Sequence, residues 1–298
     1  MSVNKASQQD VLAAKLFFTA AFPAMRVPLE EDPKQAAKFR DLNTVVQFSA
    51  EDDENPVACH IVFLSEEEAA KTEEGKRFKV YEGKYEGDLP VIDMAFPSIK
   101  SLLGVFKGNS PLDMLGIVKP LLKNMFKKGT FRFLFLMLNL MKMMPDYVPD
   151  ASDPWGQYLK VKMSLYMITR AMSRANKLGW EPMTKWTEKQ TDRIYQFRVG
   201  ATRDKDGNEL YPEIAAYLRV KAGKTKAGRG EYTRKRPFVL LDFPNPDGCI
   251  AVLSGRYEFV QAVEHKCVTV IGSGDSYAVQ FNNIMNALQA MLVPEPKN

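Results

Sequence analysis

The feature that most constrains the fold of this chain is a set of short sequence matches between its two halves. Residues 45–48 read Val-Val-Gln-Phe, and residues 194–197, which begin 149 positions later, read Ile-Tyr-Gln-Phe. A Phe-Pro pair follows in each half, at Phe96 and Phe243, and a glycine stands eleven residues after each proline. Ordered matches at a nearly constant offset indicate an internal duplication of one module.

The two halves also order their predicted elements in the same way. In each, the matched run leads through a polar loop to a second apolar run, 58–63 or 215–220, which predicts a β-hairpin. A further strand ends at the Phe-Pro pair, a short helix follows, and an apolar helix stops at Pro145 or Pro294. We therefore expect an α+β protein of two modules related by internal pseudo-symmetry, each with a mixed or antiparallel sheet of about five strands covered by helices.

The length of 298 residues suits about two domains. We predict that residues 1–150 form the first module with an N-terminal helix, and that residues 151–298 form the second. A connector helix of about 152–179 is expected at the start of the second module. Pro154 near its beginning and Gly179 just past its end are typical of helix boundaries.

The N-terminal apolar run has some likeness to a secretory signal, but Lys15 interrupts it. Its spacing favours an amphipathic helix over 11–22 with Asp10 as N-cap. The other long uncharged run, 133–141, is too short to span a bilayer. Three cysteines without CxxC spacing argue against a disulfide framework and a zinc site. We expect a cytoplasmic protein, at most peripheral on a membrane, with no cofactor and no metal.

A family resemblance emerges in the second half. The Gly-Glu-Tyr sequence at 230–232 is followed by an apolar strand, a short helix ending in glycine, a His-Lys-Cys-Val-Thr-Val-x-Gly strand at 265–272 and an apolar helix over 281–292. This order resembles the sterol carrier protein type-two family. The resemblance implies a five-stranded sheet under helices, with an apolar tunnel that holds a lipid, sterol or fatty acyl chain. The first half departs from the pattern by the stretch 112–128 and by an acidic loop at 66–74.

The segment 112–144 combines a large apolar content with positive charge, because six lysines and arginines oppose the single Asp113. Its many Phe and Met side chains suit a hydrophobic lining, since Met repacks around irregular ligands. The same residues could instead be the core of the module with the lysines as its solvated face, or a basic helix resting on an anionic lipid surface. The residues expected to contact an apolar ligand are Phe96, Leu103, Phe106, Met114, Leu115, Phe126, Phe131, Phe133, Phe135, Met137 and Met141.

A second basic stretch, 219–236, has eight lysines and arginines against the single Glu231. Three glycines within it predict a hairpin loop. A phosphate or a lipid headgroup could bind these cations, whereas the loop has no aromatic platform on which bases would stack, which argues against nucleic acid. The alternative is a solvated loop without a ligand. The candidates for anion or headgroup contact are Lys224, Lys226, Arg229, Arg234 and Arg236.

Catalytic patterns are weak throughout the sequence. His60 and His265 have no Cys, Asp or Glu at ligand spacing, and no Gly-x-Ser-x-Gly sequence occurs. We therefore expect a non-enzymatic protein that binds or carries a hydrophobic ligand in an apolar cavity. The alternative is an interaction or scaffold protein that presents a groove rich in Met and Phe to a protein partner.

Overall fold

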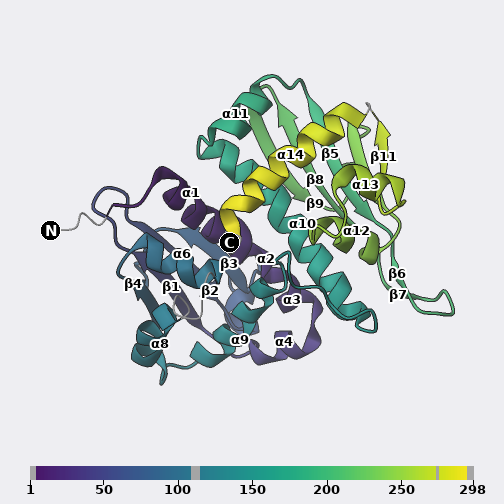
Figure 1. The fold of residues 1–298 in the computed structure, drawn as a ribbon. Coiled ribbons are helices and arrows are strands. Elements are labelled where there is room, and N and C mark those ends of the chain that lie inside the picture. The colour runs from purple at the N-terminus through teal and green to yellow at the C-terminus, as the bar shows by residue number, and fades with distance from the viewer. Residues whose placement is uncertain (1–4, 109–114, 273–274, 294–298) are drawn as a thin grey trace. The chain divides into compact units, whose positions relative to one another are not determined.

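A computed structural model describes residues 5–108, 115–272 and 275–293 (Figure 1). Contacts divide the chain into two compact units, Met1–Leu140 with Ala290–Asn298 and Met141–Gln289, here called the first unit and the second unit. The expected boundary at 150/151 lies in the segment between a helix that ends at Met141 and one that begins at Pro154. Each unit combines helices with a mixed sheet, so the chain belongs to the α+β class.

The first unit begins with one helical run that passes from α1 through a π-helical turn into two short α-helices. In chain order its described elements are α1 Gln8–Leu16, the π-turn η1 Phe17–Ala21, α2 Phe22–Ala24, α3 Arg26–Glu31, α4 Pro33–Lys38, β1 Thr44–Ala50, β2 Val57–Phe63, α5 Glu66–Ala70, β3 Phe78–Glu82, β4 Val91–Phe96, α6 Ile99–Lys107, the 3₁₀ turn η2 Leu115–Ile117, α8 Val118–Asn124 and α9 Thr130–Met141.

The N-terminal helical run is part of the core of this unit. Ser7, rather than the expected Asp10, is the N-cap, because its side chain accepts a hydrogen bond from the backbone N–H of Asp10. The rings of Phe22 and Phe106 meet Phe48 on β1 at centroid distances of 5.0 and 5.6 Å. The run Gln8–Glu31 is long and apolar enough to cross a membrane by length and composition alone, and 78% of its most apolar window is buried in the structure.

The first sheet has the strand order β3-β2-β1-β4, with β1 and β4 parallel and the other neighbours antiparallel. Burial alternates along β2, as expected for a strand with one face on the core. The described residues of this unit provide four strands where the sequence led us to expect about five. The apolar stretch after Gly129 is the helix α9, which packs Phe133 against Phe48 and Phe63.

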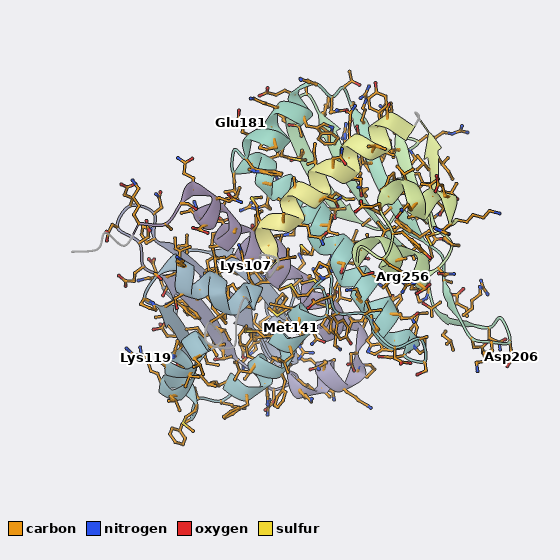
Figure 2. The ribbon with its side chains drawn as sticks, viewed as in Figure 1. Lys107, Lys119, Met141, Glu181, Asp206 and Arg256 are labelled. Atoms are coloured by element: carbon orange, nitrogen blue, oxygen red, sulfur yellow. The ribbon has the colours of Figure 1, made fainter. Side chains whose placement is uncertain are left out.

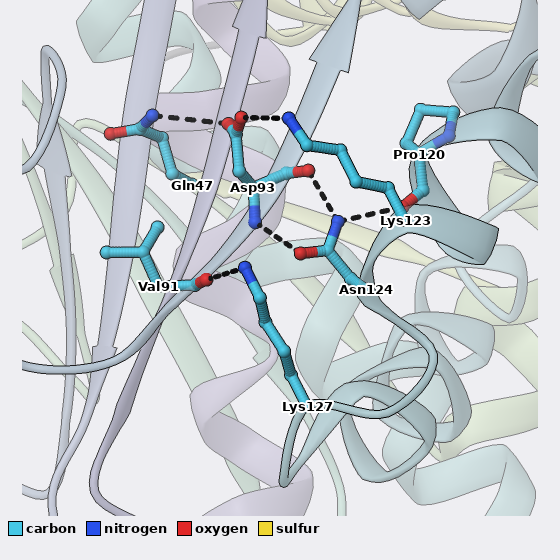
Figure 3. A network of polar contacts seen from close by, with 7 residues as sticks. All are labelled: Gln47, Val91, Asp93, Pro120, Lys123, Asn124 and Lys127. Atoms are coloured by element: carbon cyan, nitrogen blue, oxygen red, sulfur yellow. Dashed lines mark hydrogen bonds and ion pairs between the residues drawn. The ribbon is translucent and has the colours of Figure 1, made fainter.

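The free edge of β4 is covered by side chains from the α8 region (Figure 3). The Asn124 side chain accepts a hydrogen bond from the backbone N–H of Asp93 at 3.1 Å and donates one to the carbonyl of Asp93 at 2.7 Å. The Lys127 Nζ donates to the carbonyl of Val91 at 2.6 Å. These contacts satisfy backbone groups that an edge strand otherwise leaves open to pairing with another chain.

The second unit begins with the long helix α10 and ends with α14. In chain order they are α10 Pro154–Lys177, α11 Glu181–Glu188, β5 Arg193–Val199, β6 Thr202–Arg203, β7 Glu209–Tyr211, β8 Ile214–Lys221, β9 Lys224–Arg229, β10 Val239–Phe243, α12 Pro246–Leu253, α13 Phe259–Glu264, β11 Thr269–Gly272 and α14 Asp275–Leu292. Helix α10 lies at the position expected for the connector helix, with Asp153 as N-cap and Gly179 in the left-handed conformation after its end.

The second sheet has the order β11-β10-β5-β8-β9, with β10 and β5 parallel and the other neighbours antiparallel. Its core face carries Tyr195, whose ring stacks on Phe281 of α14 at 4.7 Å. The expected basic loop at 219–236 is wrong in its first part, because residues 224–229 form the strand β9. Thr225 is buried there and donates to the carbonyl of Ser173 on α10, so this side of the strand faces the core.

The Phe-Pro pairs precede a helix in both units. Ser98 and Asn245, each directly after the proline, cap α6 and α12 by accepting a backbone N–H three residues on. Gly108 and Gly255, eleven residues after the prolines, have φ angles of 68° and 71°. This left-handed conformation suits glycine at a helix end, so the expected short helix after each Phe-Pro pair is confirmed.

Candidate functional site

A pocket of about 300 Å³ opens in the first unit where α3, α4 and the adjoining ends of β2 and β3 come together. This volume is at the lower end of the range for small-molecule sites. The lining is mostly apolar on the inside and charged at the entrance. The eleven lining residues are Arg26, Leu29, Glu30, Ala36, Phe39, Phe63, Leu64, Gly75, Lys76, Arg77 and Phe78.

Three buried phenylalanines form the apolar side of the pocket. Phe63 and Phe78 are paired across β2 and β3, and their rings meet edge to face at 5.4 Å. Phe39, at the end of α4, stacks on Phe63 at 5.1 Å. Strand pairing therefore fixes two of the rings and the end of a helix supplies the third, which makes the apolar surface rigid before any ligand enters.

Charged side chains surround the opening. Arg26 on α3 pairs with Glu30 one turn later. Arg77 donates to the carbonyl of Leu64 at 3.4 Å and lies 3.5 Å from the carboxylate of Glu66. Together with the exposed Lys76, the lining has three cations and one carboxylate. Each of these cations has a carboxylate partner, since Lys76 lies 3.2 Å from Glu74, so the entrance consists of ion pairs, which are weak where solvent reaches them.

The lining combines apolar side chains with charged ones. The eleven residues include no Ser, Thr, Cys, His or Tyr, and their charged side chains are those of Arg26, Glu30, Lys76 and Arg77. Among the described residues, no group of three His, Cys, Asp or Glu side chains is placed to hold a metal ion. The pocket therefore offers apolar contact and charge pairing.

The residues expected to contact an apolar ligand separate into two groups, and none of them lines this pocket. Phe96, Leu103, Phe106 and Phe133 are buried in the core of the first unit. Leu115, Phe126, Phe131, Phe135 and Met141 are exposed, Met137 is half-buried, and Met114 lies outside the described residues. Because Phe133 faces the core while Phe135 faces solvent, the two do not line one groove.

The buried group nevertheless connects with the pocket through ring contacts. Phe133 lies 6.0 Å from Phe63, which is shared by the core and by the pocket wall. Phe106 meets Phe96 at 6.5 Å and Phe48 at 5.6 Å. These rings fill the space above the core face of the sheet, so ligand space in this unit lies beside the aromatic core, at the ends of β2 and β3.

The candidate anion contacts of the second unit are spread along one strand and the loop after it. Lys224, Lys226 and Arg229 belong to β9, whereas Arg234 and Arg236 follow it, and all five are exposed. Arg229 lies over the ring of Tyr166 at 4.7 Å. Two neighbouring cations are already engaged, since Arg219 makes a bidentate pair with Asp192 and Lys235 donates to the carbonyl of Asp192.

Sequence reasoning missed the pocket because its lining comes from separate places in the chain. Phe39, Phe63 and Phe78 stand at the ends of a helix and two strands, and only the β2–β3 register brings the last two together. A usable signal was present beside the acidic loop 66–74, where Lys76 and Arg77 directly precede an aromatic residue at a strand start.

Comparisons with known proteins give limited likenesses. No protein-family model matches the chain, and no curated protein matches it. The chain is similar to sterol carrier protein 2 from Yarrowia lipolytica in its apo form, with 16% identity and a TM-score of 0.29 over 39% of this chain and 92% of that one. A conserved hypothetical protein from Thermus thermophilus, whose description suggests a sterol carrier protein, gives 15% identity and a TM-score of 0.30 over 44% of this chain and 89% of that one.

A third likeness is to the stereoselective inverting sec-alkylsulfatase from Pseudomonas sp.. It has 13% identity and a TM-score of 0.22, and it covers 65% of this chain but 32% of the sulfatase. We therefore derive the function of this chain from its own residues.

Proposed function

We propose that this chain binds, without catalysis, an amphipathic anion such as a fatty acid in the pocket of the first unit. The observation that carries the proposal is the combination of three buried Phe rings with an entrance where the cations Arg26, Lys76 and Arg77 are held only in partly exposed ion pairs. The apolar tail would contact Phe39, Phe63 and Phe78. The acidic head would remain near Arg26 and Arg77, where charge-assisted hydrogen bonds are stronger than neutral ones.

The proposal can be tested by filling the pocket with a larger side chain. Ala36 lines the pocket on α4, and its neighbour Ala37 is exposed and does not line it. Both substitutions to Leu keep a good helix former. In a titration with dodecanoate, monitored by calorimetry, we expect Ala36→Leu to weaken binding about tenfold or more and Ala37→Leu to leave it unchanged, because losing the burial of two or three methylene groups suffices for that change.

The charged entrance is tested separately by comparing dodecanoate with dodecanol. The wild type is expected to prefer the carboxylate, and Arg77→Gln is expected to reduce this preference while the alcohol binds as before. The proposal fails if dodecanoate does not bind up to its solubility limit, or if Ala36→Leu and Ala37→Leu bind it equally well.

We also propose that the two units derive from one duplicated module. The strand orders β3-β2-β1-β4 and β9-β8-β5-β10 support this, since each has its parallel pair at the corresponding place. Two equivalent glutamines give further support. Gln47 accepts the backbone N–H of Tyr85 at 2.8 Å, and Gln196 accepts that of Tyr232 at 3.1 Å.

A further inference from the structure

The segment 115–128 in the first unit has an apolar side that faces solvent. Val118 and Leu122 are exposed one turn apart on α8, and Leu115 in the 3₁₀ turn before it and Phe126 in the turn after it are exposed as well. Phe126 is 94% exposed and Leu122 is 59% exposed. Large apolar side chains at this exposure and spacing mark an interaction surface more often than single exposed residues do.

The same segment is basic throughout. Lys119, Lys123, Lys127 and Lys128 are exposed, and the segment has no Asp or Glu. Lys123 lies 3.4 Å from Asp93 and Lys128 lies 3.0 Å from Asp41, but exposed pairs of this kind contribute little and exchange readily with other anions. Lys119 lies at the periphery of the ribbon in Figure 2.

The segment is also held in place from its inner side. Asn124 is fully buried, and besides its two bonds to Asp93 it donates to the carbonyl of Pro120 at 2.8 Å (Figure 3). The Thr130 hydroxyl donates to the carbonyl of Asn124 at 2.7 Å. The outward side is thus presented by a fixed backbone, so a partner would not have to order this helix on binding.

We propose that the segment 115–128 docks on the surface of an anionic lipid bilayer, with Leu122 and Phe126 inserted among the headgroups and Lys119 beside the phosphates. Interfacial helices combine Lys on the polar side with Phe and Leu on the other, and each Lys near an anionic surface adds to the affinity. The cores of protein interfaces are depleted in Lys, so the alternation of lysines with exposed apolar residues favours a lipid surface over a protein groove.

Vesicle co-sedimentation of the full chain tests this surface. We expect binding to vesicles of phosphatidylcholine with about one third phosphatidylserine, and much weaker binding to phosphatidylcholine alone. The double variant Leu122→Ser, Phe126→Ser should lose about tenfold or more in vesicle affinity. Val260→Ser is the matched control, because Val260 is 58% exposed on α13 in the second unit.

The contribution of lysine charge to vesicle binding is tested with Lys119→Gln, for which we expect about a fivefold loss of affinity for the anionic vesicles. Lys205→Gln, an exposed lysine in the β6–β7 loop, is its control and should change nothing. Circular dichroism and thermal unfolding establish that each variant is folded. Ala36→Leu should bind vesicles like the wild type, so a failure of the pocket proposal can be told from a failure of this one.

Three results would overturn the docking proposal. One is equal binding to neutral and anionic vesicles. Another is unchanged binding by the Leu122 and Phe126 double variant. The third is a dimer, seen by analytical ultracentrifugation, that this double variant breaks while the wild type binds no vesicles, since the surface would then lie between two copies of the chain.

Discussion

Asn124 shows at the residue scale how one side chain can take the place of a strand. Its amide forms with Asp93 the pair of hydrogen bonds that a neighbouring strand would otherwise supply, and it is 0% exposed. Replacing it by Leu would keep the volume and leave the N–H and carbonyl of Asp93 without this partner. Each buried polar group left unpaired costs about 1–3 kcal/mol.

We therefore expect Asn124→Leu to lower the free energy of unfolding of the first unit by about 2–4 kcal/mol. Urea unfolding followed by circular dichroism measures this change. Asn55→Leu is a suitable control, because Asn55 is exposed and contributes its backbone N–H, which the substitution keeps, to a bond with Asp52. A loss no larger in Asn124→Leu than in Asn55→Leu would show that the amide pair is dispensable.

Lys160 provides a pH dependence in the second unit. It is fully buried on α10, donates to the carbonyl of Met144 at 2.8 Å, and burial lowers its pKa to about 8. An unfolded lysine has a pKa of about 10.4. Between these values the unfolded chain binds more protons than the folded chain, so folding becomes more favourable as the pH rises from about 8 towards 10.

Burial also raises the pKa of Cys249 in this unit, which lowers the free energy of unfolding as the pH rises past about 8.5, so the expected outcome is a difference between proteins: between about pH 8 and 9.5 the free energy of unfolding rises more, or falls less, in the wild type than in Lys160→Met. Urea titrations at several pH values over this window measure it. The window ends below about pH 10 because burial raises the pKa of Tyr195 to about 12, which works in the opposite sense above that pH. An equal change with pH in both proteins would contradict the assignment to Lys160.

At the scale of elements, the short helices after the Phe-Pro pairs test the correspondence of the two units. Ser98 caps α6 with a bond of 3.1 Å, and Asn245 caps α12 with one of 3.0 Å. We expect Ser98→Ala and Asn245→Ala each to cost about 1 kcal/mol, measured by denaturant unfolding. A cost at one position and none at the other would mean that the two caps are not equivalent in strength.

These elements also show what could be predicted from the sequence. Pro97 and Pro244 with their glycines give local signals, so the helices after them were predictable within each half. The strand β9 was not, because its two lysines and Gly228 are typical of a loop and only the contact of Thr225 with α10 shows which side is buried. The first sheet has four strands in the described residues where about five were expected, and Phe133 packs on Phe48 from the helix α9.

The candidate site was harder to predict than these elements, because its lining is brought together only by tertiary structure. The segment 112–144 was predicted to line a ligand site because of its large apolar content. The large apolar residues described there mostly fill the core or face solvent. Phe63 and Phe78 line the pocket because of their strand register, and Arg77 because it precedes Phe78. The periodicity of the sequence could identify the apolar faces of helices and strands. It could not show where the packing of these faces leaves a pocket.

At the scale of the whole molecule, the pocket is built from residues of the first unit only, whereas both units have the same succession of paired strands. The proposed ligand site therefore belongs to the first unit. We therefore expect one bound dodecanoate per chain, which native mass spectrometry would record as a single mass addition that Ala36→Leu removes.

The most direct test of ligand binding is a crystal structure of the full chain grown with dodecanoate. We predict continuous density in the first unit beside Phe39, Phe63 and Phe78, with the carboxylate within hydrogen-bond distance of Arg26 or Arg77. An empty pocket at saturating dodecanoate, or density of equal strength in the second unit, would contradict the account.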